Sequence, residues 1–194
     1  MNLKNKIQLV VMATLLGFAG VATAGKQGIS FYGGLGLAAA APSGVNGFTF
    51  DPAAAGNVFI AIEEDGWSLE YGGLATMETG TNDPDIEYSF SGSIVSLGYR
   101  TLETNSGLYF LLSVGKADVD VTEAETALPD FNFGVDGTAV TLGIGMRLDK
   151  TERMELNYSF LGMSPVDAGV GNDFDVHMLS LRYIWGGTPY DPRF

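Results

Sequence analysis

The feature that most constrains the fold is a set of eight segments in which apolar and polar residues alternate. A period of two places successive side chains on opposite faces of an extended chain, so it predicts β-strands. Most of the segments reach the roughly 9–11 residues with which a tilted strand crosses a bilayer. The segments are Gly28–Ala40, Asn57–Glu64, Trp67–Met77, Tyr88–Leu102, Gly107–Val121, Thr138–Asp149, Arg153–Met163 and Asp173–Gly186.

The connections between these segments alternate in length. The short ones are Asp65–Gly66, Glu103–Ser106 and Lys150–Glu152. The long ones are Ala41–Gly56, Glu78–Glu87, Thr122–Gly137 and Ser164–Asn172. Short turns on one side and long loops on the other are typical of barrels in the outer membrane. We therefore predict an all-β, eight-stranded antiparallel up-and-down transmembrane β-barrel, with a soluble lipocalin-like barrel as the alternative.

The two faces of the predicted strands differ in chemistry. In Thr138–Asp149, the even positions are large and apolar from Val140 to Leu148, whereas the odd positions are small, polar or charged. The first face suits lipid and the second suits the crowded lumen of a narrow barrel. The composition agrees, since only 17% of residues are charged and 27 are Gly.

Residues 1–24 are predicted to be a secretory signal peptide. Lys4 and Lys6 precede an apolar run from Ile7, and Ala22-Thr23-Ala24 provides a small-residue cleavage site. Residues 25–194 are then the barrel domain. Without the two lysines the formal net charge of −13 becomes −15. Such a charge argues against nucleic-acid binding. The lack of Cys and the single His exclude thiolate and multi-His metal sites.

Six charged residues fall on the inward face, at similar depth near the short turns. They are Glu63, Glu70, Arg100, Arg147, Glu155 and Arg182. Charges inside a membrane-embedded barrel are costly unless they pair, and arginine suits this role because its planar fork binds carboxylates. We expect a salt-bridge network that seals the lower lumen. The alternative is a gate or an ion pathway.

Four aromatic residues lie on the outward face near the same end. They are Trp67, Tyr99, Tyr183 and Trp185. Amphipathic rings at a common depth predict an aromatic girdle at the inner membrane interface.

Acidic residues gather on the long-loop side. Asp83, Asp85 and Glu87 alternate in one short stretch, and Asp118 and Asp120 do so in another. Both stretches are candidates for binding divalent cations, because hard cations take several carboxylate oxygens. Capture of a basic partner and a merely solvated acidic surface are the alternatives. No resident metal or cofactor is predicted.

The last strand carries a resemblance to a known family. It reads His177-x-Leu179-x-Leu181-x-Tyr183-x-Trp185, and Phe194 ends the sequence after the stretch Gly186–Arg193. This pattern resembles the small eight-stranded outer-membrane barrels of Gram-negative bacteria, of the OmpA-barrel and OmpX type. The resemblance implies residence in the bacterial outer membrane as a monomer in contact with lipid and lipopolysaccharide. It also implies that the barrel-assembly machinery reads an aromatic signal, for which Tyr183, Trp185 and Phe194 are candidates.

Some small outer-membrane barrels modify lipid A, so an enzymatic function needs weighing. His177 lies outward with Asp175, and Ser164 ends the preceding strand, which makes a formal triad. The chain lacks the His-x-Ser pair of the deacylases, and we predict that it is not an enzyme. The expected function is adhesion, surface interaction or envelope integrity through the acidic loops. A narrow channel for small or apolar solutes and a lipid A-modifying enzyme are the alternatives.

Overall fold

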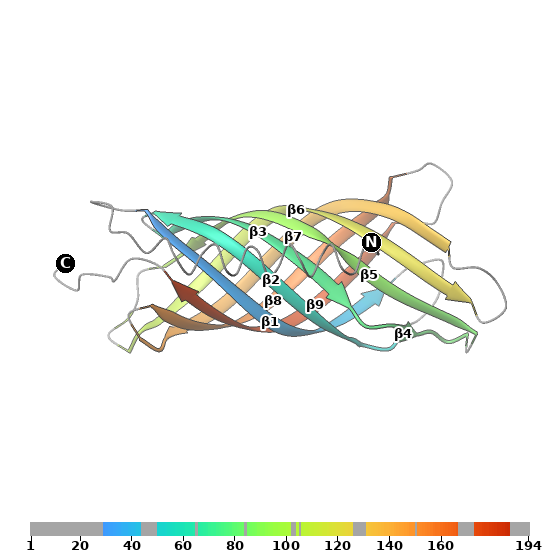
Figure 1. The fold of residues 1–194 in the computed structure, drawn as a ribbon, viewed down its shortest axis with the longest axis horizontal. Coiled ribbons are helices and arrows are strands. Elements are labelled where there is room, and N and C mark those ends of the chain that lie inside the picture. Colours follow the sequence, from blue (N-terminus) through green and yellow to red (C-terminus); the bar gives the residue numbers. More distant parts are fainter. Residues whose placement is uncertain are drawn as a thin grey trace, which may run out of the picture.

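The computed structural model describes residues 29–43, 50–64, 66–83, 85–101, 104, 106–125, 131–149, 151–166 and 173–186. Long strands run obliquely around a single barrel, as Figure 1 shows. They are β1 (Ser30–Ser43), β2 (Ala53–Glu64), β3 (Trp67–Thr76), β5 (Ile86–Arg100), β6 (Leu108–Glu125), β7 (Phe131–Arg147), β8 (Glu152–Pro165) and β9 (Phe174–Gly186). The signal peptide predicted for residues 1–24 and the aromatic Phe194 lie outside the described residues.

The barrel is closed, because every long strand has two antiparallel partners. Neighbours in sequence pair with each other, and β1 also pairs with β9. The two-residue strand β4 (Thr79–Gly80) pairs with β5 above the point where β3 ends, so β3 and β5 are direct neighbours in the ring. This confirms the predicted eight-stranded antiparallel barrel. In a closed barrel the strands satisfy one another's backbone hydrogen bonds without water, as the interior of a bilayer requires. In the described part of the chain, no helix is long and apolar enough to cross a membrane.

The strands extend further toward the long-loop side, here called the outer end, than the sequence predicts. The predicted loop Thr122–Gly137 is wrong in extent, since β6 and β7 stay paired as far as Glu123 and Phe131. Likewise β2 begins at Ala53. The physical reason is that alternation continues beyond the predicted boundary, but there the apolar side chains face the lumen and the polar ones face outward. Val121 and Val135 face inward and are fully buried there.

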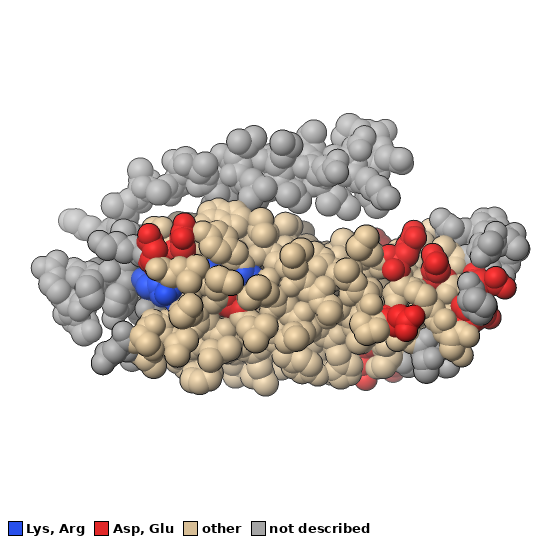
Figure 2. Space-filling model, turned by 90° about the horizontal axis from the view of Figure 1, so that it is seen from below, with Lys and Arg blue, Asp and Glu red and all other residues tan. Residues whose placement is uncertain are grey.

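The outer wall changes character along the barrel axis. Near the short turns, here called the turn end, β6 exposes Phe110, Leu112 and Val114, each more than half exposed. Above them the outward positions are Lys116 and Asp118, which are also exposed. Figure 2 shows an uncharged middle and acidic side chains gathered toward the outer end. An apolar band is therefore available to lipid, and a polar wall rises above it.

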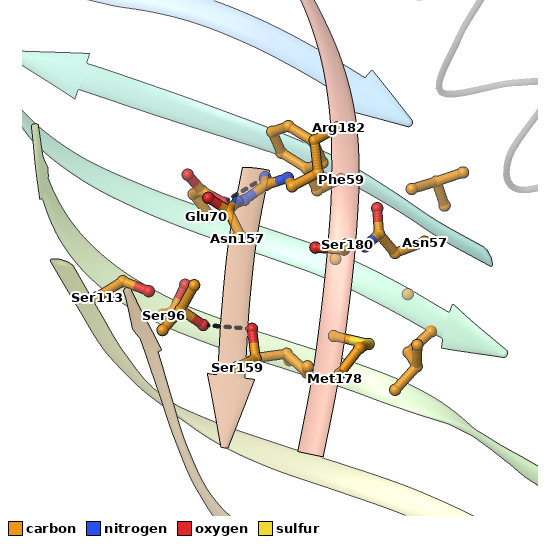
Figure 3. Close-up of a pocket in the computed structure, with 16 residues that line it drawn as sticks. Asn57, Phe59, Glu70, Ser96, Ser113, Asn157, Ser159, Met178, Ser180 and Arg182 are labelled. Atoms are coloured by element: carbon orange, nitrogen blue, oxygen red, sulfur yellow. Dashed lines mark hydrogen bonds and ion pairs between the residues drawn. The ribbon is translucent and has the colours of Figure 1, made fainter. Parts of the chain in front are cut away.

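The lumen changes in the opposite sense. Its outer half is an apolar core whose members include Phe90, Val119, Val135, Leu161 and Met163. Its turn half holds polar and charged side chains, and a small cavity lined by both polar and apolar side chains lies between the two halves (Figure 3). The prediction of a small, polar lumen is thus right for the turn half and wrong for the outer half.

Glycines make room for large inward side chains in the turn half. A Cβ at Gly143 would lie 1.9 Å from Asn157 Oδ1, and one at Gly145 would lie 2.2 Å from the ring of Tyr109. Both separations are far below van der Waals contact, so a Cβ at either position would force the neighbouring side chain to move. Part of the high glycine content is therefore explained by the packing of large side chains inside the lumen.

Candidate functional site: a buried ion network across the lumen

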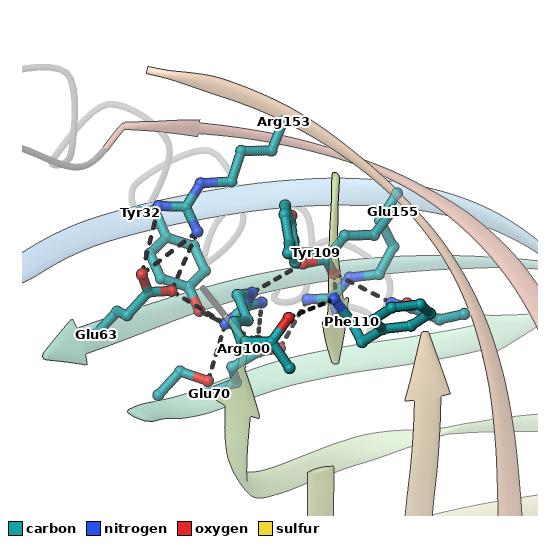
Figure 4. A network of polar contacts seen from close by, with 12 residues as sticks. Tyr32, Glu63, Glu70, Arg100, Tyr109, Phe110, Arg153 and Glu155 are labelled. Atoms are coloured by element: carbon teal, nitrogen blue, oxygen red, sulfur yellow. Dashed lines mark hydrogen bonds and ion pairs between the residues drawn. The ribbon is translucent and has the colours of Figure 1, made fainter. Parts of the chain in front are cut away.

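Arg100 lies at the centre of the polar half of the lumen and is 3% exposed. Its guanidinium donates to three carboxylates, as Figure 4 shows: Nη2 to Glu70 Oε1 at 2.7 Å, Nε to Glu155 Oε1 at 2.9 Å and Nη1 to Glu63 Oε2 at 3.3 Å. The same guanidinium also bonds the hydroxyls of Tyr32 and Ser68. One arginine on β5 thus connects the neighbouring strands β2 and β3 with β8, which lies across the lumen from them.

Two further arginines complete the network. Arg182 Nη2 lies 2.7 Å from Glu70 Oε2, and its guanidinium carbon lies 3.5 Å from the centre of the Phe59 ring. Arg153 Nη1 lies 3.1 Å from Glu63 Oε2. Since the stacked ring and the carboxylates hold both guanidiniums, each arginine has a defined orientation.

The network balances its charges and bonds its carboxylates several times. Three arginines face three glutamates, and Tyr32 and Tyr109 donate to Glu70 and Glu155 at 3.2 and 3.0 Å. Buried ion pairs are tolerable only with such additional bonds, because each ion loses its hydration on burial. The arrangement is therefore a neutral closure of the lumen rather than a set of groups available for chemistry.

The structure brings together five of the six predicted inward charges. Arg147 is the exception: it ends β7, where its backbone N–H donates to the Gly107 carbonyl at 3.0 Å. The third arginine of the network is Arg153, which the sequence reasoning missed. Its inward parity, two residues before Glu155, was the available signal. Tyr32 and Tyr109 were missed as well, because inward tyrosines look like ordinary packing residues.

The four predicted girdle residues lie at the turn end. Trp67 and Tyr99 are cross-strand neighbours with ring centres 5.0 Å apart. Tyr183 and Trp185 follow each other on the outward face of β9, with ring centres 6.0 Å apart. Trp67 is 55% exposed and Tyr99 is 38% exposed, so their rings can reach the interface.

The two predicted cation-binding stretches are not brought together. Asp83 Oδ1 accepts the backbone N–H of Asp85 at 3.1 Å, which is a turn contact. Asp118 and Asp120 lie outward on β6 opposite Ser93 and Ser91, whereas Glu87 lies opposite Ala124, four residues further along. Among the described residues, no group of three or more His, Asp or Glu side chains is close enough to hold a metal ion.

The formal triad is not assembled either. His177 Nδ1 lies 2.7 Å from the Tyr158 hydroxyl and packs edge-on against Phe160. Phe160 is directly opposite His177 in the ladder. Ser164 is four residues beyond that point, roughly 13 Å along the strand at about 3.3 Å per residue. This distance separates the serine from the imidazole.

Comparison with known proteins gives matches by structure only. No family model matches the sequence, and no curated protein matches it. Neisserial surface protein A has a similar structure with a TM-score of 0.68 and 12% identity, over 82% of this chain and 99% of that one. Ail of Yersinia pestis, in complex with the heparin analogue sucrose octasulfate, gives a TM-score of 0.57 and 13% identity, over 84% and 99%. The N-terminal barrel of Pseudomonas aeruginosa OprF gives 0.50 and 10%, over 78% and 97%.

The fold and the outer wall together define the class of protein. A closed eight-stranded barrel with an apolar band, an aromatic end and a lumen that is polar at that end is a small bacterial outer-membrane β-barrel. The fold is the one that Neisserial surface protein A, Ail and the OprF domain have. At this level of identity the likeness extends to the fold alone.

Proposed function

We propose that the chain is a non-conducting, non-enzymatic outer-membrane barrel whose function is carried out by its acidic outer end. The observation that carries this proposal is the closed lumen. Arg100 bonds three glutamates across one half, and an apolar core that includes Val119 and Leu161 fills the other. A lumen of eight strands is just wide enough for side chains to fill it. The narrow channel for solutes is therefore the less favoured alternative.

The outer end is strongly acidic, which indicates the kind of partner it attracts. The acidic residues described there are Asp51, Glu78, Asp83, Asp85, Glu87, Asp118, Asp120, Glu123, Asp136, Asp173 and Asp175. Among the described residues of this half, Lys116 is the single basic one, and it pairs with Asp136 at 2.9 Å. Such a field attracts cationic surfaces and repels polyanions. We therefore propose adhesion to, or capture of, basic partners, and we expect no binding of polyanions such as sucrose octasulfate, the heparin analogue found in complex with Ail.

The closed lumen is tested by conductance in planar bilayers. Purified protein is expected to give no single-channel steps above background, even when it is inserted at high density. Reproducible steps would support the solute channel instead. An outer-membrane enzyme is tested separately by mass spectrometry of lipid A from cells that express the chain, in which we expect an unchanged lipid A profile.

The surface function is tested by binding of proteoliposomes to polylysine-coated and heparin-coated surfaces. We expect retention on polylysine and none on heparin. Replacing Asp118 and Asp120 by Asn removes two exposed outer charges and should weaken retention. The matched control replaces Glu64 and Asp149, which are exposed at the turn end, by Gln and Asn. Equal loss in both variants, or retention on heparin, would contradict the proposal.

A further inference from the structure

Three side chains form a row at the outer end of the lumen, above the apolar core. Tyr88 of β5 is directly opposite Glu123 of β6, and Glu123 is directly opposite Phe131 of β7. The three strands reach the outer end side by side (Figure 1). Residues directly opposite in a ladder have their side chains on the same face of the sheet, about 5 Å apart at Cβ. Because Tyr88 belongs to the apolar core, this face is the inner one.

The carboxylate of this outer row is held in a defined orientation. The Tyr88 hydroxyl donates to Glu123 Oε2 at 2.6 Å. Tyr88 is itself fully buried, and the Phe50 ring packs edge-on against it with ring centres 5.2 Å apart. Glu123 is only partly buried. Its carboxylate is therefore fixed on the protein side while it remains accessible from the water outside.

A half-exposed aromatic ring flanks this carboxylate. Phe131 is 51% exposed, although it has the inward parity of Phe133 and Val135. Its ring lies against that of Phe133, with ring centres 5.8 Å apart, and Phe133 is a buried member of the apolar core. The face of an aromatic ring attracts a cation, because the ring quadrupole is negative there. The outer row thus offers a carboxylate and an aromatic ring to the same ligand.

The ion network shows what such a combination binds. There Tyr32 donates to Glu70 at 3.2 Å, and Arg182 bonds the same carboxylate at 2.7 Å. The guanidinium carbon of Arg182 lies 3.5 Å from the centre of the Phe59 ring. Within the part of the chain that the structure describes, no arginine or lysine pairs with Glu123. The outer row therefore has the tyrosine, the carboxylate and the aromatic ring of the network without a described cation.

We propose that the outer row of Tyr88, Glu123 and Phe131 is a binding site for an arginine side chain of another protein. This inference rests on the proposed function, since it assigns a position to one basic side chain of the partner. A guanidinium can donate to a carboxylate and stack on a ring at once, whereas an ammonium is a compact, strongly hydrated charge. The acidic outer end attracts any polycation, and the outer row adds a preference for arginine.

The test compares oligoarginine and oligolysine peptides of equal length on the full chain in phosphatidylcholine nanodiscs. Surface plasmon resonance measures both dissociation constants, with empty nanodiscs as the reference. We expect the arginine peptide to bind about tenfold more tightly, because only the site distinguishes the two cations. Equal affinities would overturn the site and leave the proposed attraction of basic partners intact. Binding of neither peptide would contradict the site and the proposed function together.

Two variants assign the preference to the outer row. Glu123→Gln keeps an acceptor for the Tyr88 hydroxyl but removes the negative charge, so the preference for arginine should disappear. Phe131→Leu keeps an apolar side chain without the ring face and should lower the preference several-fold.

The matched control for both variants is Asp120→Asn, which removes one charge from the outward face of β6. It should weaken both peptides alike and preserve their ratio, because Asp120 is not part of the outer row. Heat-modifiable gel migration verifies that each variant is folded. A preference that survives in folded Glu123→Gln, or that Asp120→Asn abolishes equally, would overturn the proposal.

Discussion

The two halves of strand β6 carry opposite patterns of polarity. From Leu108 to Val114 the outward side chains are apolar, while Ser113 faces the lumen. From Lys116 to Asp120 the outward side chains are charged, while Val119 and Val121 face the apolar core. Alternation of inward and outward positions continues without interruption through both halves, so the strand itself does not change. What changes is the solvent around it.

The difference between the two halves of β6 indicates where the surroundings of the barrel change from lipid to water. In the turn half, lipid surrounds the barrel and polar side chains fill the lumen, as is usual for membrane barrels. In the outer half, water surrounds the barrel, and burial of apolar side chains inside stabilises it as in a soluble barrel. The boundary on β6 falls between Val114 and Lys116. The same change occurs on the neighbouring β7 between Val140 and Thr138.

The largest expected difference between the halves concerns their ion pairs. Arg100→Met leaves the buried Glu70 and Glu155 and the partly buried Glu63 without their shared partner, and such a change should lower the free energy of unfolding by about 3–5 kcal/mol. Lys116→Met removes an exposed pair on the outer half and should leave the free energy of unfolding nearly unchanged, because water and salt screen exposed charges. Urea unfolding in lipid vesicles measures both. Equal effects would show that the network is not the dominant polar contact.

Part of the loss in Arg100→Met should be recovered by removing one of the stranded charges. The double variant Arg100→Met with Glu155→Gln leaves less uncompensated charge in the lumen, because Arg182 and Arg153 still face Glu70 and Glu63. We expect its stability to lie between that of the single variant and the unmodified chain. A double variant less stable than Arg100→Met alone would contradict this electrostatic explanation.

A charge introduced on the outer wall should lower the free energy of unfolding only in the turn half. Leu112 is 55% exposed in the apolar band, and Leu112→Arg should destabilise the protein in vesicles by about 2–4 kcal/mol. Asp120→Arg, on the same face of β6 in the outer half, should leave stability unchanged within about 0.5 kcal/mol. A large cost at position 120 would place that position in lipid and would break the comparison.

Replacing a glycine of the lumen by alanine should lower the free energy of unfolding by a smaller amount. Gly143→Ala drives a methyl group into Asn157 Oδ1 and should cost about 1–3 kcal/mol. The nearest atom to a Cβ at Gly56 is 4.0 Å away, so Gly56→Ala is the matched control and should be neutral or slightly stabilising. The same vesicle unfolding assay compares them. Equal stability of the two variants would contradict the tight packing described for the lumen.

Most of the barrel could be predicted from the sequence, and the reason is the period of two. Alternation in segments such as Thr138–Asp149 predicts both that the segment is a strand and which of its side chains face outward, because the face in contact with lipid must be apolar. Glu63, Glu70, Arg100, Glu155 and Arg182 were found by parity alone. Their convergence needed only similar depth on neighbouring strands, which the positions of the short turns already supplied.

The rest depended on information that local patterns do not hold. The start of β7 was assigned to the predicted loop Thr122–Gly137, although its inward residues Phe133 and Val135 are buried and continue the strand. Arg147 and Arg153 are directly opposite each other in the β7–β8 ladder, so the strand pattern alone does not tell which of the two reaches Glu63. The bond from Asn157 Nδ2 to Glu155 Oε2, at 3.2 Å, became apparent only from the three-dimensional packing.

The change of environment along β6 is tested most directly by spin labels at its outward positions. Single labels at positions 110, 112, 114, 118 and 120 in lipid vesicles report access to oxygen, which partitions into lipid, and to a nickel chelate, which stays in water. We predict high oxygen access through position 114 and high nickel access at 118 and 120. Lipid-like access at 118 and 120 would contradict the account, because the acidic wall would then lie in the membrane.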